Sequence, residues 1–197
     1  MKLFYSPASP FARKVRIVAA ELGLADRIEV APISPWVEEG LRGYNPLSKI
    51  PALALDDGTV LFDSRVICDY LNALGSAELI PATGWARTLC LRMEALADGI
   101  GDAGVRRIVE ERRAGGDGHQ DVIARQNLAL QAALNLAEAE ADDFGEAFDL
   151  GQIALASALG YLDFRLSHED WRVGRPDLAA WFVKVSARHS VSSTIPV

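Results

Sequence analysis

Close to its beginning, the chain carries the sequence Tyr5-Ser6-Pro7-Ala8-Ser9-Pro10-Phe11-Ala12-Arg13-Lys14-Val15-Arg16. The residues before it predict a short strand over 1–5. Pro10 predicts the first position of a helix, where its missing N–H costs nothing. Ser9 would then lie at the helix N-terminus, where free backbone N–H groups and the helix dipole favour an anion. This corner therefore predicts a site for a thiolate, a phosphate or a carboxylate.

Three basic residues follow the corner, at Arg13, Lys14 and Arg16. They could help to receive a small anion, or they could form an ordinary solvated helix face, and the sequence alone leaves both open. The whole chain has 20 basic and 27 acidic side chains, which gives a formal net charge of −7. That balance argues against a non-specific nucleic-acid binder, which needs a basic surface.

The composition is that of a globular protein, with 197 residues, 50% of them apolar and 24% charged. The longest apolar run, 153–162, is shorter than the roughly 20 residues that a membrane helix needs. Prolines and Arg13 interrupt the N-terminal segment, so it lacks the pattern of a secretory signal. Two cysteines, Cys68 and Cys90, form no disulfide framework. We expect a cytoplasmic protein that does not span a membrane.

The first part of the chain has a mixed helix and strand pattern. Apolar periodicity and turn residues predict, in order, a strand over 1–5, a helix over 10–23, strands over 27–33, 52–55 and 59–62, and a helix over 64–74. The last two strands flank Asp56-Asp57-Gly58, whose Asp-Gly pair is a strong hairpin signal. A β-α-β unit followed by a β-β-α unit is the thioredoxin-like order with a mixed sheet.

After residue 75 only helical patterns remain. They predict helices over 85–113, 121–142, 153–166 and 176–188, with a turn at Gly115-Gly116-Asp117-Gly118. Asp149, with Gln152 three residues later, has the spacing of a helix N-cap ahead of the third of these. The chain is therefore expected to have an α+β thioredoxin-like domain over 1–76, a linker over 77–84 and an all-α domain over 85–197.

A second motif, Asn45-Pro46-Leu47-Ser48-Lys49-Ile50-Pro51, precedes the predicted hairpin. Cis peptide bonds are uncommon even before proline, at about 5–6% of such bonds. In a thioredoxin-like sheet, however, a cis bond before Pro51 would turn the backbone edge of Ile50 outward. Its N–H and C=O could then pair with a peptide-like ligand as an added strand.

A third motif, Asp63-Ser64, opens the helix predicted over 64–74. Both residues are ordinary helix caps. They could also bind a ligand, since the helix N-terminus and the Ser64 hydroxyl suit a carboxylate while Asp63 suits an ammonium group. One amino-acid head group satisfies both. A short peptide with a central thiol and an α-amino acid at one end would fit all three motifs, and glutathione is such a molecule.

At this point the sequence resembles the glutathione transferase family. The resemblance rests on Ser9-Pro10-Phe11-Ala12-Arg13, on Asn45-Pro46 with Ile50-Pro51 and on Asp63-Ser64, and it continues through 94–100 and 153–165. It is strongest toward small bacterial YibF-like members. The family has a thioredoxin-like domain followed by an all-helical domain, and it forms homodimers.

The resemblance implies a role for each motif in binding glutathione as co-substrate. Ser9 would hydrogen-bond the sulfur, Ile50 before Pro51 would pair with the cysteinyl unit, Asp63 and Ser64 would hold the γ-glutamyl end, and Lys49 would lie near the glycyl carboxylate. Tyr5 is the rival hydroxyl, because some classes use a tyrosine at the end of the first strand. Further candidates for the pocket are Phe11, Arg13, Trp36 and Arg106, the last two with surface or core positions as the alternative.

The implied reaction is attack by the glutathione thiolate on a small hydrophobic electrophile. Members that perform thiol–disulfide chemistry carry cysteine where this chain has Ser9, so a reductase or peroxidase is disfavoured. A binding module with little turnover remains the main alternative. We expect no metal, because His119, His168 and His189 are isolated. We also expect no nucleotide, because Gly99-Ile100-Gly101-Asp102-Ala103-Gly104 follows a helical stretch rather than a strand.

Overall fold

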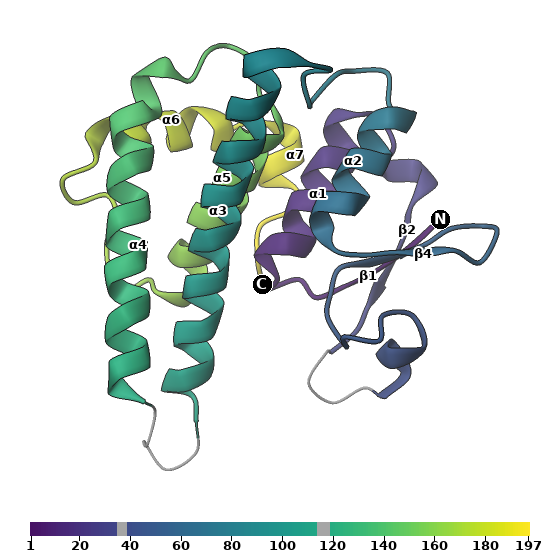
Figure 1. Ribbon diagram of the computed structural model, residues 1–197, viewed down its shortest axis with the longest axis horizontal. Coiled ribbons are helices and arrows are strands. Elements are labelled where there is room, and N and C mark those ends of the chain that lie inside the picture. Colours follow the sequence, from purple (N-terminus) through teal and green to yellow (C-terminus); the bar gives the residue numbers. More distant parts are fainter. Residues whose placement is uncertain (35–38, 114–118) are drawn as a thin grey trace.

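The computed structural model describes residues 1–34, 39–113 and 119–197, and it divides into a small mixed sheet with two helices and a bundle of helices (Figure 1). The predicted fold class is confirmed. The exact division at residues 76 and 85 stays a prediction, although the segment before Gly84 has neither helix nor strand from Gly75 onward.

The sheet contains β1 (Lys2–Tyr5), β2 (Glu29–Pro32), β3 (Ala52–Ala54) and β4 (Val60–Leu61), in the spatial order β2-β1-β3-β4. β1 is parallel to β2 and antiparallel to β3, and β3 is antiparallel to β4. The register places Leu3 opposite both Val30 and Leu53. This is the mixed sheet that the β-α-β and β-β-α order predicts.

Two helices, α1 (Pro10–Glu21) and α2 (Ser64–Leu74), cover one face of the sheet and separate it from the helical bundle (Figure 1). Their buried residues join the sheet in one core that includes Leu3, Val15, Ile67 and Leu71. The other face carries a smaller cluster in which Leu41, from the short 3₁₀ helix Glu39–Gly43, packs on Phe4 and Ala52.

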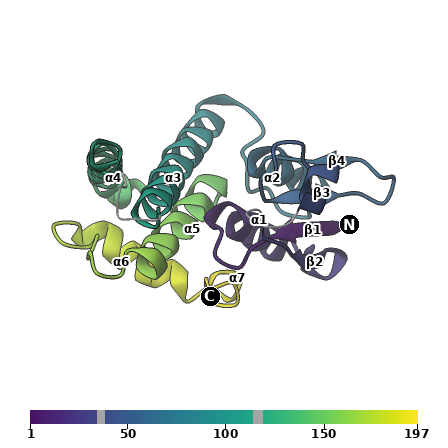
Figure 2. The same ribbon diagram turned by 90° about the horizontal axis from the view of Figure 1, so that it is seen from below.

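The bundle contains α3 (Gly84–Glu111), α4 (Gln120–Glu140), α5 (Leu150–Arg165), α6 (Pro176–Ser186) and α7 (His189–Ser192), with a 3₁₀ turn at Ala141–Asp143. α5 is buried along its length from Leu150 to Leu162, because it lies between α3 and α1 (Figure 2). Its cap is as predicted, since the Asp149 carboxylate accepts a hydrogen bond from Gln152 N.

Several sequence expectations need correction. The predicted strand over 27–33 is shorter, because Ala25–Arg27 forms a 3₁₀ turn and the strand begins at Glu29. The apolar periodicity that predicts the helices over 64–74 and 85–113 does not mark buried positions throughout, because Val66 and Leu74 on α2 and Leu89 on α3 are each substantially exposed. The short helix α7 was not predicted. The turn expected at 115–118 lies outside the described residues.

Two glycines of the segment Gly99 to Gly104, which imitates a nucleotide-binding motif, allow other helices to pack closely against α3. A Cβ added at Gly101 would lie 3.3 Å from the Phe11 ring, and one at Gly104 would lie 3.2 Å from the Tyr161 ring. These contacts bring the start of α1 and the middle of α5 against α3. In the three described ranges, no helix combines the length and apolar character needed to cross a membrane.

Candidate functional site

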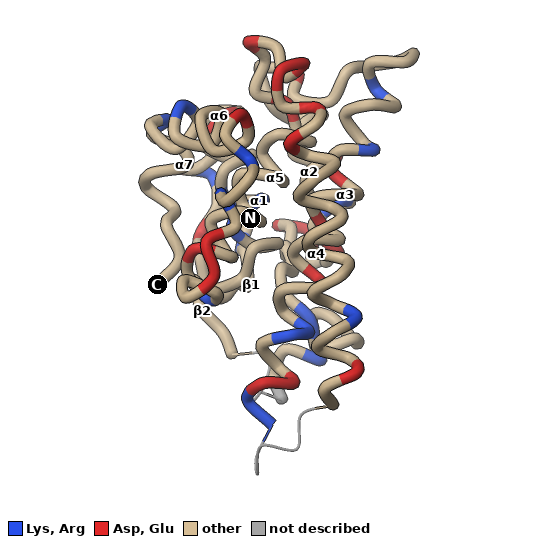
Figure 3. The backbone as a smooth tube through the Cα atoms, turned by 90° about the vertical axis from the view of Figure 1, so that its left-hand side faces the viewer, with Lys and Arg blue, Asp and Glu red and all other residues tan. Residues whose placement is uncertain are grey.

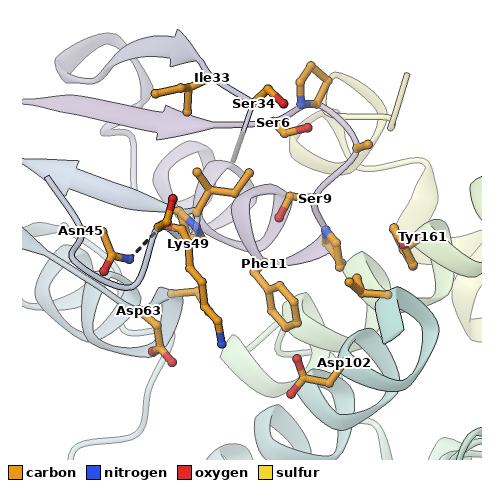
Figure 4. A pocket seen from close by; sticks show the side chains of 18 of the residues that line it. Ser6, Ser9, Phe11, Ile33, Ser34, Asn45, Lys49, Asp63, Asp102 and Tyr161 are labelled. Atoms are coloured by element: carbon orange, nitrogen blue, oxygen red, sulfur yellow. Dashed lines mark hydrogen bonds between the residues drawn. The ribbon is translucent and has the colours of Figure 1, made fainter. Parts of the chain in front are cut away.

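A cleft of about 1210 Å³ opens between the sheet part and the helical bundle. Its lining brings together six of the predicted site residues on one side: Ser9, Lys49, Ile50, Pro51, Asp63 and Ser64. Phe11, a candidate pocket residue, also lines it. The opposite wall comes from α3 and α5. Figure 4 shows Ser9 between the Asn45, Lys49 and Asp63 group and Tyr161 of α5.

Ser9 is the N-cap of α1, and its hydroxyl oxygen accepts a hydrogen bond from Ala12 N at 3.2 Å. Pro10 occupies the first helical turn, and that turn contains no acidic residue. The positive end of the α1 dipole therefore faces the cleft without a local carboxylate to neutralise it. A serine hydroxyl can accept this bond and still donate its own proton to an anion.

The loop before β3 is held by Asn45, which is almost completely buried. Its amide nitrogen donates to Lys49 O at 2.8 Å, and its amide oxygen accepts from Leu47 N at 3.0 Å. Figure 4 shows the bond to Lys49 beneath the cleft. These two bonds fix the backbone that leads into Ile50 and Pro51. The peptide bond between those two residues is cis, as predicted.

The N-terminus of α2 lies at the same cleft. The exposed Asp63 carboxylate caps the helix by accepting from Arg65 N at 3.1 Å, and Ser64 is buried in the cleft lining. Capping, the ordinary role of Asp63, is thus confirmed. Two helix N-termini converge on one cleft, and the first turn of α2 also contains no acidic residue. Such convergence favours a ligand with more than one anionic group.

Behind this wall, a buried ionic cluster joins α1 and α2 to α3. Lys14 Nζ lies 2.9 Å from Glu94 Oε1 and 2.8 Å from Asp98 Oδ1, and Arg65 Nε lies 2.9 Å from Asp98 Oδ2. Burial alone would lower the pKa of Lys14, but Cys68, Asp98 and Glu94 outweigh it and hold the pKa above its usual value. Lys14 is therefore a structural cation.

Both alternatives that the sequence left for the basic stretch after Ser9 are wrong for Arg13 and Lys14. Neither residue receives an anion at the cleft and neither is solvated, because both are buried. Arg13 donates to Val191 O at 3.1 Å, and its Nε and Nη1 atoms have no partner in the described part of the chain. Burial lowers the pKa of Arg13 to about 10.

Three candidate pocket residues do not line the cleft. Arg13 points to α5 and α7, as described above. Tyr5 packs against the core with the Arg16 guanidinium 5.2 Å from its ring centre. Arg106 borders a separate groove between α3 and α4, next to Asp121 and Arg125. The remaining candidate, Trp36, lies outside the described residues.

The cleft wall on α3 was not predicted from the sequence. Besides Ile108, it contains a series of residues at alternating steps of four and three, and they are Asp98, Asp102, Val105, Val109 and Arg112. Such spacing places side chains on one helix face. The periodicity was available in the sequence, but it predicts a buried face just as well as a ligand-facing one.

The end of the cleft that is lined by Lys49, Asp63 and Asp102 carries charges of both signs. Figure 4 shows the Lys49 side chain extending between Asp63 and Asp102. Burial has the largest effect on the pKa of Asp102 and raises it, and the nearby Asp98 carboxylate raises it further. The positive charges of Lys49 and Arg65 oppose this rise. Over the whole molecule, both signs of charge are interspersed, including at the ends of α3 and α4 (Figure 3).

Neither cysteine offers a reactive thiolate. Cys68 and Cys90 are free and buried, and burial raises the pKa of each to about 12. Cys68 therefore serves as a small buried apolar group. Within the part of the chain that the structure describes, no group of three or more His, Cys, Asp or Glu side chains could hold a metal ion.

Comparison with known proteins agrees with this architecture. Residues 8–74 match the family model of the glutathione S-transferase N-terminal domain, and residues 120–183 match that of the C-terminal domain. The uncharacterized GST-like protein YibF of Escherichia coli (strain K12) is 33% identical over 201 residues, which cover 100% of this chain and 98% of YibF. The chain belongs to the glutathione S-transferase family.

Solved structures of this family share the fold closely. A glutathione transferase family member from Pseudomonas fluorescens Pf-5, crystallised with bound glutathione, has a TM-score of 0.96 and 42% identity, covering 100% of this chain and 98% of that one. Another structure of a glutathione transferase family member from the same source holds S-(propanoic acid)-glutathione. It has a TM-score of 0.91 and 41% identity, with 100% of both chains covered.

Proposed function

We propose that this glutathione S-transferase family member binds glutathione in the cleft and transfers its thiolate to a small hydrophobic electrophile. The observation that carries the proposal is the convergence of two helix N-termini on one cleft, capped by Ser9 and Asp63. Ile50 belongs to the same lining, and the opposite wall on α3 includes the apolar side chains Val105 and Val109. The bound glutathione and S-substituted glutathione in relatives support the same use of the cleft.

Ser9 is the residue that we propose to activate the thiol. A free cysteine-type thiol has a pKa of about 8.5, and each unit of lowering requires about 1.4 kcal/mol of preferential interaction with the anion. A charge-assisted hydrogen bond from the Ser9 hydroxyl and the α1 dipole together supply about 1–2 units. Tyr5 is the weaker candidate, because its ring packs in the core rather than along the cleft.

The remaining glutathione contacts follow from the cleft lining. We propose that the Ile50 backbone before Pro51 pairs with the cysteinyl unit, that Asp63 and Ser64 hold the γ-glutamyl end, and that Lys49 lies near the glycyl carboxylate. The apolar side chains Val105 and Val109 of α3 would hold the electrophile near the sulfur. Positioning two reactants in this way supplies much of the rate acceleration that such a reaction needs.

Two other functions compete with this proposal. A glutathione-dependent reductase or peroxidase needs an accessible thiolate, whereas Cys68 and Cys90 are both buried with pKa values of about 12. A glutathione-binding module without turnover would use the same cleft. We propose a transferase rather than a binding module, with a cytoplasmic location and a detoxification role, and the turnover assay below distinguishes the transferase from the binding module.

We also propose that two copies associate. Arg87 and Asp69 link the start of α3 to α2, with 3.8 Å between their charged atoms. These two helices carry the exposed apolar side chains Val66, Leu74, Trp85 and Leu89, and Trp85 is 72% exposed. We propose that these four side chains form one patch at the interface, because contiguous exposed apolar surface favours association.

Retention on a glutathione-affinity matrix tests binding, and conjugation of 1-chloro-2,4-dinitrobenzene tests turnover. We expect both, with turnover lowered about 10- to 100-fold in Ser9→Ala, which corresponds to losing the roughly 1–2 units by which the thiol pKa is lowered. Ser9→Asn is the matched control for the helix cap, because asparagine caps as well as serine. Its side-chain amide can still donate a hydrogen bond to the sulfur, so it should retain more turnover than Ser9→Ala. Retention without turnover would favour the binding module, and no retention would leave the fold alone. Unchanged turnover in both variants would move thiol activation to Tyr5 or to backbone donors.

A further inference from the structure

The cleft wall on α3 changes character along its length. Asp98 and Asp102 lie at one end, Val105 and Val109 in the middle, and Arg112 at the other end. A helix rises 1.5 Å per residue, so Val105 and Arg112 are separated by about 10 Å along the axis. That length matches an apolar body the size of a substituted aromatic ring followed by a charged group.

The position of Ser9 along this wall is fixed by its neighbours. Pro10 and Phe11, which follow Ser9, lie against α3 at Gly101, where an added Cβ would be 3.5 Å from Pro10 and 3.3 Å from Phe11. Ser9, which is proposed to hold the sulfur, therefore lies at the same height along α3 as Asp98 and Asp102. An electrophile that extends from the sulfur toward the other end passes the valines and reaches Arg112.

A second arginine joins Arg112 at this far end. Tyr161 and Arg165 of α5 both line the cleft, one helical turn apart, and the buried Tyr161 ring packs against Gly104. The Tyr161 hydroxyl lies within electrostatic reach of both guanidinium groups. Burial raises the pKa of Tyr161, and Arg165 and Arg112 oppose that rise. Both arginines therefore line the cleft on the side where Tyr161 lies.

Neither arginine is neutralised by a carboxylate within residues 1–34, 39–113 and 119–197. The ion pairs of α3 near this end belong to other residues, since Arg107 pairs with Glu111 and Glu169, and Arg113 pairs with Glu110. Arg165 instead stacks on the Phe164 ring, with 4.2 Å between its Cζ atom and the ring centre. Two guanidinium groups beside an apolar wall match the planar geometry of a carboxylate.

We propose that the cleft selects electrophiles that carry a carboxylate at the end remote from the reacting carbon, and that Arg112 and Arg165 bind this carboxylate. The inference rests on the proposed transferase function and narrows its substrate class. Arg112 and Arg165 are specificity residues in this scheme. The thiolate attack itself takes place at the Ser9 end.

A matched pair of aryl chlorides tests the proposal. With 4-chloro-3,5-dinitrobenzoate or its neutral amide, the glutathione sulfur forms a bond to the ring carbon that bears chlorine. Chloride leaves with the bonding electron pair, and the thiol proton passes to solvent. Each enzymatic rate is divided by the uncatalysed rate with glutathione, so that intrinsic reactivity cancels. The wild type is expected to prefer the carboxylate by about tenfold, the scale of one charge-assisted hydrogen bond.

The double variant Arg112→Gln/Arg165→Gln should lose this preference, so that the two electrophiles are conjugated equally well relative to their uncatalysed rates. Arg106→Gln is the control, because it removes an exposed arginine of the same helix that borders the other groove. Arg112→Lys/Arg165→Lys should recover part of the preference, because the point charges return. Higher salt should reduce the wild-type preference through screening. An equal preference in wild type and double variant, or none in the wild type, overturns the proposal.

Binding of the two aryl-glutathione products, measured by calorimetry, separates this inference from the proposed function. If neither the amide nor 1-chloro-2,4-dinitrobenzene is conjugated, the transferase function fails, and the affinity ratio of the two products still decides the carboxylate preference. A ratio near one in the wild type contradicts the inference even where turnover is found. A ratio of about ten that disappears in the double variant supports it.

Discussion

The ammonium nitrogen of Lys14 lies 2.8 Å from Oδ1 of Asp98, and both side chains are buried. Lys14 belongs to α1 and Asp98 to α3, so the contact joins the two halves of the molecule. Glu94 and Arg65 complete a cluster with two cations and two anions. The positive and negative charges compensate one another, so removing one buried member leaves another charge without a partner.

Lys14→Met should destabilise the fold by about 3–5 kcal/mol, because it leaves the Glu94 carboxylate buried without a cation. Urea unfolding measures the loss. The double variant Lys14→Met/Glu94→Gln should recover much of it, since Arg65 and Asp98 then remain as a neutral pair. A double variant less stable than the single one would contradict this account of the cluster.

Gly160→Ala should destabilise the fold by about 1–3 kcal/mol, the usual cost of overpacking a core. The added Cβ would lie 1.9 Å from Nη1 of Arg13, a buried guanidinium already held by Val191 O. Gly99→Ala is the control, because nothing lies within 4 Å of its Cβ. That change should stabilise α3 by about 0.5–1 kcal/mol. Similar thermal shifts in both variants would refute the predicted clash.

Neither cysteine of the native protein should react quickly with a thiol reagent. With a pKa of about 12, the thiolate fraction of Cys68 or Cys90 at pH 8 is about one in ten thousand. A chromogenic aromatic disulfide should therefore titrate both thiols in urea and neither one rapidly without it. A fast-reacting thiol in the native protein would reopen the reductase alternative.

The contact of Glu21 with the C-terminal segment should weaken in acid. Burial alone would raise the pKa of Glu21, but hydrogen bonds from Arg188 and Ser190 outweigh it and hold the pKa below the usual 4.5. A lowered folded pKa means that the contribution is full above pH 4.5 and is lost as pH falls through the folded value. The stability difference between wild type and Glu21→Gln should shrink over that window in urea titrations. A pH-independent difference would show that Glu21 acts through packing.

Trp85→Glu should convert the proposed dimer into a monomer. The charge would lie in the exposed patch on α2 and α3, where burying it against a second copy is costly. Val183→Glu on α6 is the control, because that side chain is also exposed but lies outside the patch. Sedimentation at micromolar concentrations distinguishes the species. A wild type that already sediments as a monomer would contradict the proposed association.

The features that could be predicted from the sequence are those set by neighbouring residues. Ser9 and Pro10 define the start of α1, Asp63 caps α2, and Asp149 caps α5, because each cap bonds within its own first turn. The order of strands and helices along the thioredoxin-like part followed from the same local signals. These elements carry six of the predicted site residues to one cleft.

The features that escaped prediction depend on contacts between distant parts of the chain. Lys14 looks like a surface residue until Glu94 and Asp98, about 80 residues later, surround it. The Asp102 to Arg112 face of α3 has the spacing of a core face, and only the position of α1 and α5 shows that it borders a cleft. The same reason explains why Arg13, beside Ser9 in sequence, points away from it.

The buried cluster around Lys14 also limits how relatives of this protein can exchange their halves. In a chimera that keeps α1, the helical part comes from a homologue. The cluster is complete only if that homologue has carboxylates at the positions of Glu94 and Asp98. Without those carboxylates, the grafted interface would enclose an uncompensated ammonium group. Successful recombination across the linker therefore requires donors with the same charge set. Because of this ionic cluster, the two halves of the molecule must change together when relatives diverge.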